Sequence, residues 1–338
     1  MNRPVSSLQC QPASSVKRHI VSRIGHWTLR AALFALVLAT SARAQTNLVI
    51  VSGIGGEATY TQSFAQLSSA LAQAAHDRAK LGDSSITWLG EPNAPKSRWL
   101  RGASTRENVE RTLTQLAERA SAESQIVMVL IGHGSGEGAE TRISLPGPDI
   151  TATDFAKILA RFGRRRVAFI NLTSASGDML AVIAGPNRVV MTATKSAFER
   201  NESQFARFFV DAFTHDGADT DKDGRISLLE AFRYADAETK RFYENDSRLA
   251  TEHAQLADES ELAGRFFLTP GTSERVGQAG GTRLAVLHAE QAALDQQIAA
   301  LKRRKSQMTA EAYDAELERL LIALALKSRE IRQLERGS

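Results

Sequence analysis

Cysteine is nearly absent from this sequence of 338 residues, and the single cysteine, Cys10, lies within the first 44 residues. If those residues are removed, the remaining chain holds no thiol, which excludes disulfide bonds and a cysteine nucleophile. Long apolar runs are also missing, since none approaches the roughly 20 residues that a membrane-spanning helix needs. These absences exclude a disulfide-stapled scaffold, and they predict a chain without a transmembrane span.

Acidic residues are missing from residues 1–44, which carry six basic residues. Within this segment Ala31–Ala39 is an apolar run too short to cross a bilayer, and Ala42-Arg43-Ala44 offers small residues at a cleavage position. This order is typical of a secretory signal peptide over residues 1–44, so we predict export to the periplasm or the extracellular space. The alternative is an interfacial anchor that is retained.

The net charge changes sign once the predicted signal is set aside. The whole sequence has 42 basic and 38 acidic residues, a formal charge of +4. Residues 1–44 hold six of the bases, so residues 45–338 hold 36 bases and 38 acids, a formal charge of −2. This balance lacks the basic excess on which nucleic-acid binding depends. We therefore predict no nucleic-acid partner.

From residue 47 onward, short apolar runs of β type alternate with longer segments of helical periodicity near residues 60–79, 105–121 and 151–162. This alternation is typical of an α/β domain with a mainly parallel sheet flanked by helices. The predicted strands are Leu48–Ser52, Ser85–Leu89, Ile126–Ile131, Arg166–Asn171 and Arg188–Thr194. The predicted core-facing residues of the helices are Phe64, Leu67, Leu71, Val109, Leu113, Leu116, Phe155, Ile158 and Phe162.

The composition changes after residue 269. Residues 270–282 are rich in Gly, Ser and Thr, which is typical of a linker. Two heptad patterns follow within residues 283–336, separated by a break at which Thr309 can cap the second helix. We predict a coiled-coil helical hairpin over residues 283–336, which either docks on the preceding domain or mediates self-association.

A twelve-residue segment, Asp219–Glu230, fills every position of an EF-hand calcium loop. It offers carboxylates at positions 1, 3 and 5, a backbone carbonyl at 7, a hydroxyl at 9 and a bidentate carboxylate at 12, and Gly224 permits the sharp turn at 6. The alternative, an acidic helix N-terminus, does not require this spacing. We predict Ca²⁺ as the cofactor, with the ligands Asp219, Asp221, Asp223, Arg225, Ser227 and Glu230.

The predicted calcium loop lies between two predicted helices, Ser203–Phe213 and Leu228–Tyr243. The sequence has no second loop of this type, and calcium sensors work through helix pairs that open on binding. We therefore predict a structural clasp between these helices and not a sensor.

Two glycine-containing turns follow predicted strands: Gly132-His133-Gly134 and Thr173–Gly177. In these residues the chain resembles the caspase and legumain class of peptidases, in which a His-Gly turn and an Ala-Cys-x-Ser-Gly turn place an imidazole and a thiol at the carboxyl ends of the strands. His133 matches the histidine, and Ser174 stands where the family has its cysteine. The resemblance implies a caspase-like three-layer sandwich for residues 46–269, similar to a bacterial exported subgroup with an EF-hand loop and a helical tail.

The serine at position 174 alters the chemistry that the resemblance implies. A thiol is readily ionised by its surroundings, whereas a serine hydroxyl needs a base that a third group orients. The sequence does not identify this third group, although Asp149, Asp154 and Asp178 are candidates. We therefore predict a catalytically inactive peptidase-like domain with a scaffold or recognition role toward a protein or peptide. The alternative is a serine peptidase of the same fold that uses His133 with Ser174, or with Ser176 as the nucleophile.

A third interpretation starts from Gly53–Ala58, which matches the pattern G-x-G-x-x-A between a strand and a helix. A dinucleotide-binding fold seats a pyrophosphate on such a turn. It also needs an acidic residue about 20 residues later, at the end of the second strand. Here the predicted second strand ends at Leu89, 31 residues after Ala58. Dinucleotide binding is therefore the least favoured of the three interpretations.

Overall fold

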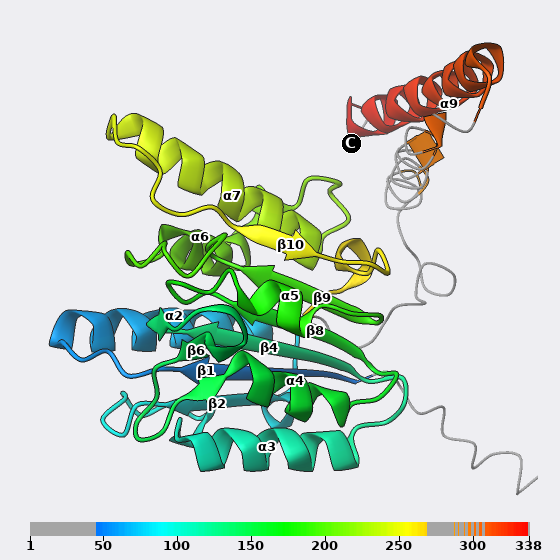
Figure 1. Ribbon diagram of the computed structural model, residues 1–338. Coiled ribbons are helices and arrows are strands. Elements are labelled where there is room, and N and C mark those ends of the chain that lie inside the picture. The colour runs from blue at the N-terminus through cyan, green and yellow to red at the C-terminus, as the bar shows by residue number, and fades with distance from the viewer. Residues whose placement is uncertain are drawn as a thin grey trace, which may run out of the picture. The chain divides into compact units, whose positions relative to one another are not determined.

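A computed structural model describes residues 45–268, isolated positions between 287 and 305, and residues 308–336. The predicted signal segment 1–44 and the predicted linker 270–282 lie outside the described residues. Within the described ranges, no helix combines the length and the apolar character that crossing a bilayer requires. Figure 1 shows an α/β domain and, at the C-terminal end of the chain, helix α9 (Ala310–Arg336).

A seven-stranded sheet with the order β10-β9-β8-β4-β1-β2-β3 forms the centre of the α/β domain. Its neighbouring strands are parallel, except that β10 runs antiparallel to β9. The central strands β1 and β4 are buried along their whole length, which explains their continuous apolar sequences. The strands are β1 (Thr46–Ser52), β2 (Ile86–Gly90), β3 (Leu100–Ala103), β4 (Gln125–Ile131), β8 (Arg166–Asn171), β9 (Arg188–Thr192) and β10 (Gln255–Ala257).

Helices cover both faces of this sheet, so the predicted three-layer α/β architecture is confirmed (Figure 1). One hydrophobic core lies between the sheet and α2 (Ala58–Asp77), α6 (Gln204–Ala212) and α7 (Leu228–Asn245). The other lies between the sheet and α3 (Arg106–Arg119), α4 (Ala152–Ala160) and α5 (Met179–Ile183). Short 3₁₀ turns are η1 (Asp83–Ser85), η2 (Gly138–Glu140), η3 (Asp216–Ala218) and η4 (Ala263–Arg265).

The helical periodicity of the sequence locates the core. Eight of the nine predicted core-facing side chains are buried. The ninth, Leu67, is partly buried and packs against the first core. Four helices of the α/β domain, α3, α4, α6 and α7, are capped by a Ser or Thr whose hydroxyl accepts a hydrogen bond from the backbone N–H three residues later. These capping residues are Thr105, Thr151, Ser203 and Ser227.

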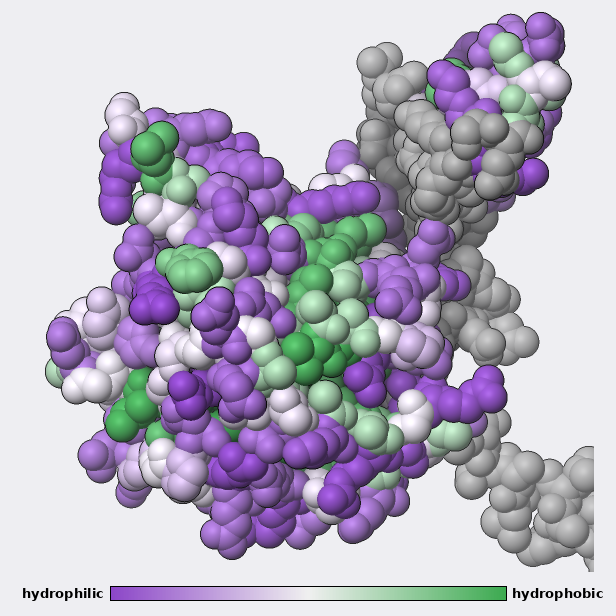
Figure 2. Space-filling view, in the orientation of Figure 1, coloured by the Kyte–Doolittle hydropathy of each residue, from purple (hydrophilic) through white to green (hydrophobic). Residues whose placement is uncertain are grey.

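Several short elements were not predicted from the sequence. A second, three-stranded antiparallel sheet consists of β5 (Gly134–Ser135), β6 (Arg142–Ile143) and β7 (Ile150–Thr151), which are too short to show periodicity. Helix α5 has only five residues. Figure 2 shows a mainly hydrophilic surface with a hydrophobic strip near α5, where Leu180 and Val182 are only partly buried.

Helix α9 confirms the second of the two predicted C-terminal helices. The Thr309 hydroxyl accepts a hydrogen bond from the Ala312 backbone N–H at 3.3 Å, as expected of the predicted N-cap. The buried residues Tyr313 and Leu320 of this helix form a small apolar cluster with Ile298 and Leu301. The two heptad patterns therefore contact each other, as a helical hairpin requires.

Candidate functional site

The predicted calcium loop joins two helices that pack closely against each other. Ring pairs connect α6 to α7, with centroid separations of 5.6 Å for Phe205 and Phe232 and 6.3 Å for Phe208 and Phe242. The turn η3 follows α6, and Asp219–Glu230 then leads into the first turn of α7. The loop is therefore anchored at both ends on the same hydrophobic core.

Three aspartates converge within the loop. Carboxylate oxygens of Asp219, Asp221 and Asp223 all lie within 4.8 Å of one another, and these residues can hold a metal ion. Backbone N–H groups fix the carboxylates: Gly224 donates to Asp219 Oδ2 at 2.9 Å, and Asp223 donates to Asp221 Oδ1 at 3.2 Å. Gly224 has a φ of +80°, so the sharp turn predicted at this position is present.

The converging carboxylates disfavour one another's ionised forms. Burial is the largest cause that raises the pKa of Asp221 to about 6, followed by the charges of Asp223 and Glu230. Burial also raises the pKa of Asp219, and the charges of Asp223 and Glu230 add to this effect. An oxygen-seeking cation in this cluster would remove the repulsion, because carboxylate oxygens are the ligands that hard divalent cations prefer.

The carboxylate of Glu230, the predicted ligand at position 12, is turned toward the backbone of the loop. Its Oε1 accepts hydrogen bonds from the Thr220 N–H and hydroxyl, both at 2.9 Å. Its Oε2 accepts from the Ser227 N–H at 2.9 Å and from the Ser227 hydroxyl at 2.8 Å. The Arg225 guanidinium binds Asp223 Oδ2 at 2.6 Å. If Glu230 bound a metal ion, its carboxylate would exchange the hydrogen bonds with Thr220 and Ser227 for bonds to the metal.

The end of the loop pairs with the last described residues of the α/β domain. Ser227 forms an antiparallel bridge with Phe267, and the Leu228 N–H donates to the Phe266 carbonyl at 2.9 Å. The Arg225 guanidinium lies over the Phe267 ring, 4.1 Å from its centroid. The loop thus holds three segments together: α6, α7 and the chain that leads out of the domain.

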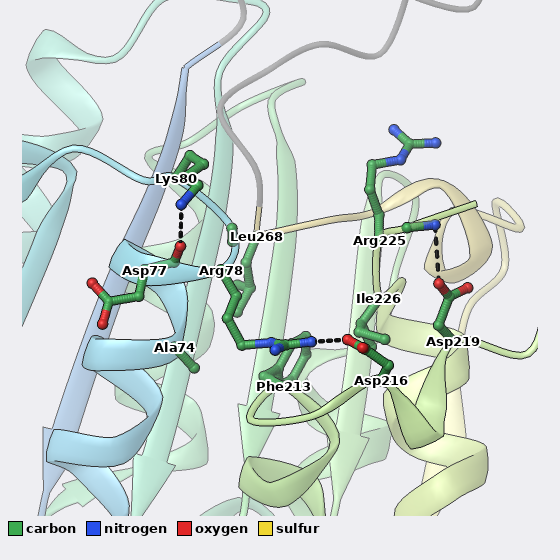
Figure 3. A pocket seen from close by; sticks show the side chains of 12 residues that line it. Ala74, Asp77, Arg78, Lys80, Phe213, Asp216, Asp219, Arg225, Ile226 and Leu268 are labelled. Atoms are coloured by element: carbon green, nitrogen blue, oxygen red, sulfur yellow. Dashed lines mark hydrogen bonds and ion pairs between the residues drawn. The ribbon is translucent and has the colours of Figure 1, made fainter. Parts of the chain in front are cut away.

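A pocket lies on the side of the loop that faces the end of α2 (Figure 3). The Arg78 guanidinium pairs with Asp216 across this pocket, and Lys80 Nζ donates to the Asp77 carbonyl at 2.6 Å. Arg225, which also lines the pocket, pairs with Asp223. The pair between Arg78 and Asp216 therefore ties the segment just before the loop to the end of α2.

The two peptidase-like turns lie side by side. His133 follows β4 and Ser174 follows β8, and these strands are adjacent and parallel. The Gly134 N–H donates to the Ser174 hydroxyl oxygen at 3.3 Å. A Cβ at Gly134 would lie 2.2 Å from the Ser174 carbonyl oxygen, so the close approach of the turns requires glycine. The side chain of Ser174 is nevertheless buried, with 3% of its surface exposed.

The imidazole of His133 packs against two aromatic rings of α2. The ring centroids of Tyr60 and Phe64 lie 4.7 Å and 5.0 Å from that of His133, both edge-on. Among residues 45–268, no hydrogen bond or ion pair involves the His133 side chain. Leu172 and Glu202 are among the residues that line the small pocket beside it. The arrangement gives His133 packing partners but no hydrogen bond to a hydroxyl that it could deprotonate.

The three acids considered as the orienting group are engaged elsewhere. Asp178 accepts a hydrogen bond from the Gly138 N–H at 2.8 Å. Asp149 accepts from the Leu145 N–H at 3.0 Å. Asp154 pairs with Arg106 at 2.8 Å, and its pKa is lowered by hydrogen bonds from Thr151 and by Arg106, which outweigh the opposing effect of burial. None of these carboxylates has a hydrogen bond or ion pair with His133.

Ser176, the alternative nucleophile, is part of a buried polar network. Its hydroxyl lies 3.2 Å from the Thr194 hydroxyl and accepts from the Thr194 N–H at 3.2 Å, and it has no exposed surface. A Cβ at Gly177 would lie 2.1 Å from the Lys195 carbonyl carbon. The chain that follows β9 therefore lies directly on the turn and covers it.

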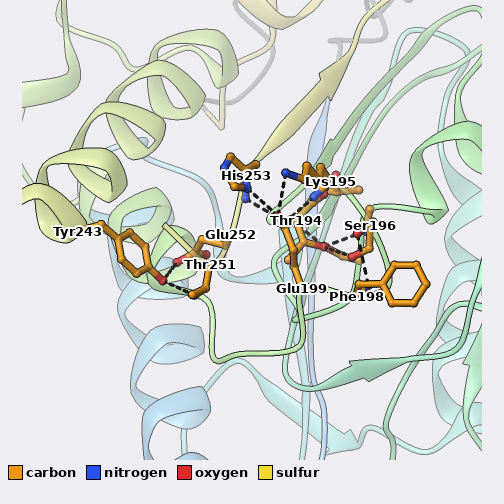
Figure 4. Close-up of polar contacts among 12 residues, drawn as sticks. Thr194, Lys195, Ser196, Phe198, Glu199, Tyr243, Thr251, Glu252 and His253 are labelled. Carbon is orange, nitrogen blue, oxygen red and sulfur yellow. Dashed lines mark hydrogen bonds and ion pairs between the residues drawn. The ribbon is translucent and has the colours of Figure 1, made fainter. Parts of the chain in front are cut away.

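Two buried or half-buried acids hold this covering segment in place, and sequence reasoning missed both (Figure 4). Glu199 pairs with His253 Nδ1 at 2.6 Å, and its carbonyl accepts from the Ala175 N–H at 2.7 Å. Glu252 accepts hydrogen bonds from the Ser203 hydroxyl at 2.7 Å and the Gln204 N–H at 2.8 Å, at the beginning of α6. No periodicity or motif links these positions, because the partners are about 50 residues apart.

The glycine-rich turn Gly53–Ala58 is packed against its neighbours. The Ile54 N–H donates to the Ser144 carbonyl at 3.0 Å, and a Cβ at Gly53 would lie 2.5 Å from that oxygen. A Cβ at Gly55 would lie 2.3 Å from the Thr61 nitrogen. Gly53 and Gly55 are therefore needed for close packing against Ser144 and against Thr61 of α2.

Comparisons with known proteins identify no family. No protein-family model and no curated protein matches the chain. Among solved structures, the chain is similar to the crystal structure of protein GSU0716 from Geobacter sulfurreducens, with 10% sequence identity and a TM-score of 0.45. That similarity covers 67% of this chain and 99% of the other.

Proposed function

We propose that this chain is an exported calcium-binding protein whose α/β domain is caspase- or legumain-like in architecture and has no peptidase activity. The observation that carries the calcium assignment is the convergence of Asp219, Asp221 and Asp223 oxygens within 4.8 Å, in a loop whose sequence matches the EF-hand pattern through Glu230. All of these candidate ligands are oxygens, which favours Ca²⁺ over softer metals.

The role of the ion would be structural. Asp219–Glu230 is the connection between α6 and α7, and its last residues pair with Phe266 and Phe267. Binding at this place would stabilise the contacts among the three segments, since a ligand that binds the folded state alone stabilises it. An exported protein would meet abundant calcium, so a site of modest affinity would be occupied.

Calcium titration by isothermal calorimetry tests the assignment. Residues 45–338, stripped of metal with a chelator, are expected to bind one Ca²⁺ per chain and to prefer Ca²⁺ to Mg²⁺. Asp221→Asn removes a carboxylate of the cluster and is expected to abolish binding. Asp216→Asn is the matched control, because Asp216 lies three residues before the loop and pairs with Arg78. Unchanged binding by the Asp221 variant would contradict the assignment.

The absence of peptidase activity is inferred from the surroundings of the candidate catalytic residues. Ser174 and Ser176 have 3% and 0% of their surface exposed, and His133 has no hydrogen bond to either. The alternative function is a serine peptidase of the same fold. It would need His133 to reach a serine hydroxyl, and an acid to orient the His133 ring. A panel of fluorogenic peptides tests the choice: cleavage by the calcium-loaded protein, lost in Ser174→Ala and His133→Ala, would establish the serine peptidase instead.

Dinucleotide binding through Gly53–Ala58 is supported less well. Gly53 and Gly55 are required for close packing against the Ser144 carbonyl and Thr61, which accounts for these glycines without a ligand. The proposed role of the domain is therefore to recognise a protein or peptide partner or to serve as its scaffold.

A further inference from the structure

Helix α9 has two apolar faces, of which one packs on other described residues and one is exposed. One face of the helix packs inward: Tyr313 and Leu320 are buried with Ile298 and Leu301. The ion pair between Lys327 Nζ and a Glu290 oxygen, 2.7 Å apart, also joins the two segments. These contacts account for one side of the helix.

Leu321, Ile322 and Leu326 on the other side are 47%, 53% and 57% exposed. They are three of the six large hydrophobic residues that are exposed among the described residues, and they fall within six consecutive positions. Leu321 and Ile322 line a shallow groove with Ala325. Exposed apolar residues gathered in this way mark an interaction surface, whereas the three in the α/β domain are dispersed.

The charges on either side of this apolar groove differ in sign along the helix. Asp314 and Glu318 line its N-terminal part, and Arg329 is exposed one to two turns beyond its C-terminal part. Leu321 and Ile322 lie midway between Asp314 and Arg329, which are 15 residues, or about 22 Å, apart on the helix. No hydrogen bond or ion pair with another described residue uses the side chains of Asp314, Glu318 or Arg329.

A face with this pattern is complementary to itself in one orientation only. If two copies of α9 pair in antiparallel directions, each acidic end meets the basic end of the other copy, and the apolar centres coincide. Parallel pairing would instead place Asp314 beside its own counterpart and Arg329 beside its own, which is repulsive. An interface related by a two-fold axis uses the same patch on both copies, as this arrangement does.

We propose that the groove formed by Leu321, Ile322 and Ala325 binds the same groove of a second copy of this chain, giving a two-fold dimer with antiparallel α9 helices. The proposal does not depend on calcium binding, because none of its residues belongs to the metal loop.

The mass of residues 45–338 in solution tests the proposal. Sedimentation equilibrium over a series of concentrations is expected to give twice the mass of one chain, with and without chelator. Leu321→Glu with Ile322→Glu is expected to halve that mass, while Leu249→Glu, at a 90% exposed position in the α/β domain, leaves it unchanged. Circular dichroism of each variant checks that the helices remain, since the changed residues lie outside the buried cluster.

Charge exchange tests the antiparallel orientation. Asp314→Arg with Glu318→Arg is expected to weaken the dimer, and adding Arg329→Glu in the same chain is expected to restore it. Three results would overturn the proposal: a monomer at every concentration, which would indicate that the groove docks on its own α/β domain or remains uncovered; a dimer that survives both glutamate substitutions; or a dimer insensitive to the charge exchange.

Discussion

The metal loop Asp219–Glu230 and the strand-end turns around His133 and Ser174 differ in how their polar side chains are paired. In the loop, three aspartate carboxylates converge, and burial together with the charges of Asp223 and Glu230 raises the pKa values of Asp219 and Asp221. At the strand ends, each serine hydroxyl accepts a hydrogen bond from a backbone N–H, and the turn is covered. Asp223 pairs with Arg225, whereas the carboxylates of Asp219 and Asp221 accept hydrogen bonds from backbone N–H groups, so a cation would stabilise their ionised forms. The first can hold a metal ion, and the second holds the strand ends closed.

The largest expected loss of stability comes from Glu252, which closes the strand-end region. Glu252→Ala removes the acceptor for the Ser203 hydroxyl, two backbone N–H groups at the beginning of α6 and the Tyr243 hydroxyl. Because unpaired buried donors cost about 1–3 kcal/mol each and hydroxyls can rotate to other partners, we expect a loss of roughly 3 kcal/mol. Urea unfolding measures it, and Glu244→Ala on the exposed surface of α7 is the control. A loss no greater than that of the control would mean that Glu252 does not stabilise this region.

A thiol introduced at position 174 tests whether the strand ends are closed. Ser174→Cys introduces the cysteine that caspase- and legumain-like peptidases have at this position, and residues 45–338 contain no other cysteine. Since the position is 3% exposed, we expect alkylation by iodoacetamide to be about 100-fold slower than in urea, as for a group that reacts only after local opening. Ser135→Cys, at an exposed position, is the control and should react equally fast in both states. Rapid alkylation of the folded Ser174→Cys protein would indicate an accessible, activated site.

Ser176 is expected to contribute less than Glu252 but more than a surface serine. Ser176→Ala leaves the buried Thr194 N–H without its acceptor, which should cost about 1–2 kcal/mol. The free energy of unfolding of this variant, compared with that of Ser135→Ala, gives the difference. Equal stability of the two variants would show that the network around Thr194 does not matter for the fold.

The smallest expected effect is a dependence of stability on pH through Glu252. Burial raises the pKa of Glu252 above its ordinary 4.5, although the Ser203, Gln204, Phe205 and Tyr243 donors oppose this. The folded state therefore holds its proton to a higher pH than the unfolded state does. This contribution to stability is complete below pH 4.5 and is lost as the pH rises through the folded-state pKa. Urea unfolding at several pH values should show a steeper decline in the unmodified protein than in Glu252→Gln, because the raised pKa values of Asp219 and Asp221 produce a decline of the same sign in both proteins.

The sequence was sufficient to predict the fold where periodicity is strong. The continuous apolar runs that became β1, β4, β8 and β9 and the helical spacing of residues such as Val109, Leu113 and Leu116 each follow directly from burial on one or both faces. Strand β9 ends at Thr192 and not at Thr194, and the backbone N–H of Thr194 donates to the Ser176 hydroxyl instead of to a neighbouring strand. Two-residue strands and the five-residue α5 carry too few residues for any pattern.

The candidate site was predictable only where its residues are close in sequence. The aspartates of the metal loop lie two residues apart, so their convergence is a local property. The Glu199–His253 and Glu252–Ser203 contacts join segments about 50 residues apart, and only tertiary packing brings them together. Sequence alone could also align His133 with Ser174, but whether a base can reach a hydroxyl depends on rings such as Tyr60 and Phe64, whose positions no motif specifies.

The most direct test of the account is the effect of calcium on stability. For residues 45–338, the free energy of unfolding in urea is expected to rise by about 2.7 kcal/mol when free calcium exceeds its dissociation constant 100-fold, relative to the protein in chelator. Asp219→Asn should remove this gain, and Asp216→Asn should keep it. A protein whose stability is the same in millimolar calcium and in chelator would contradict the claim that Asp219–Glu230 is a calcium clasp.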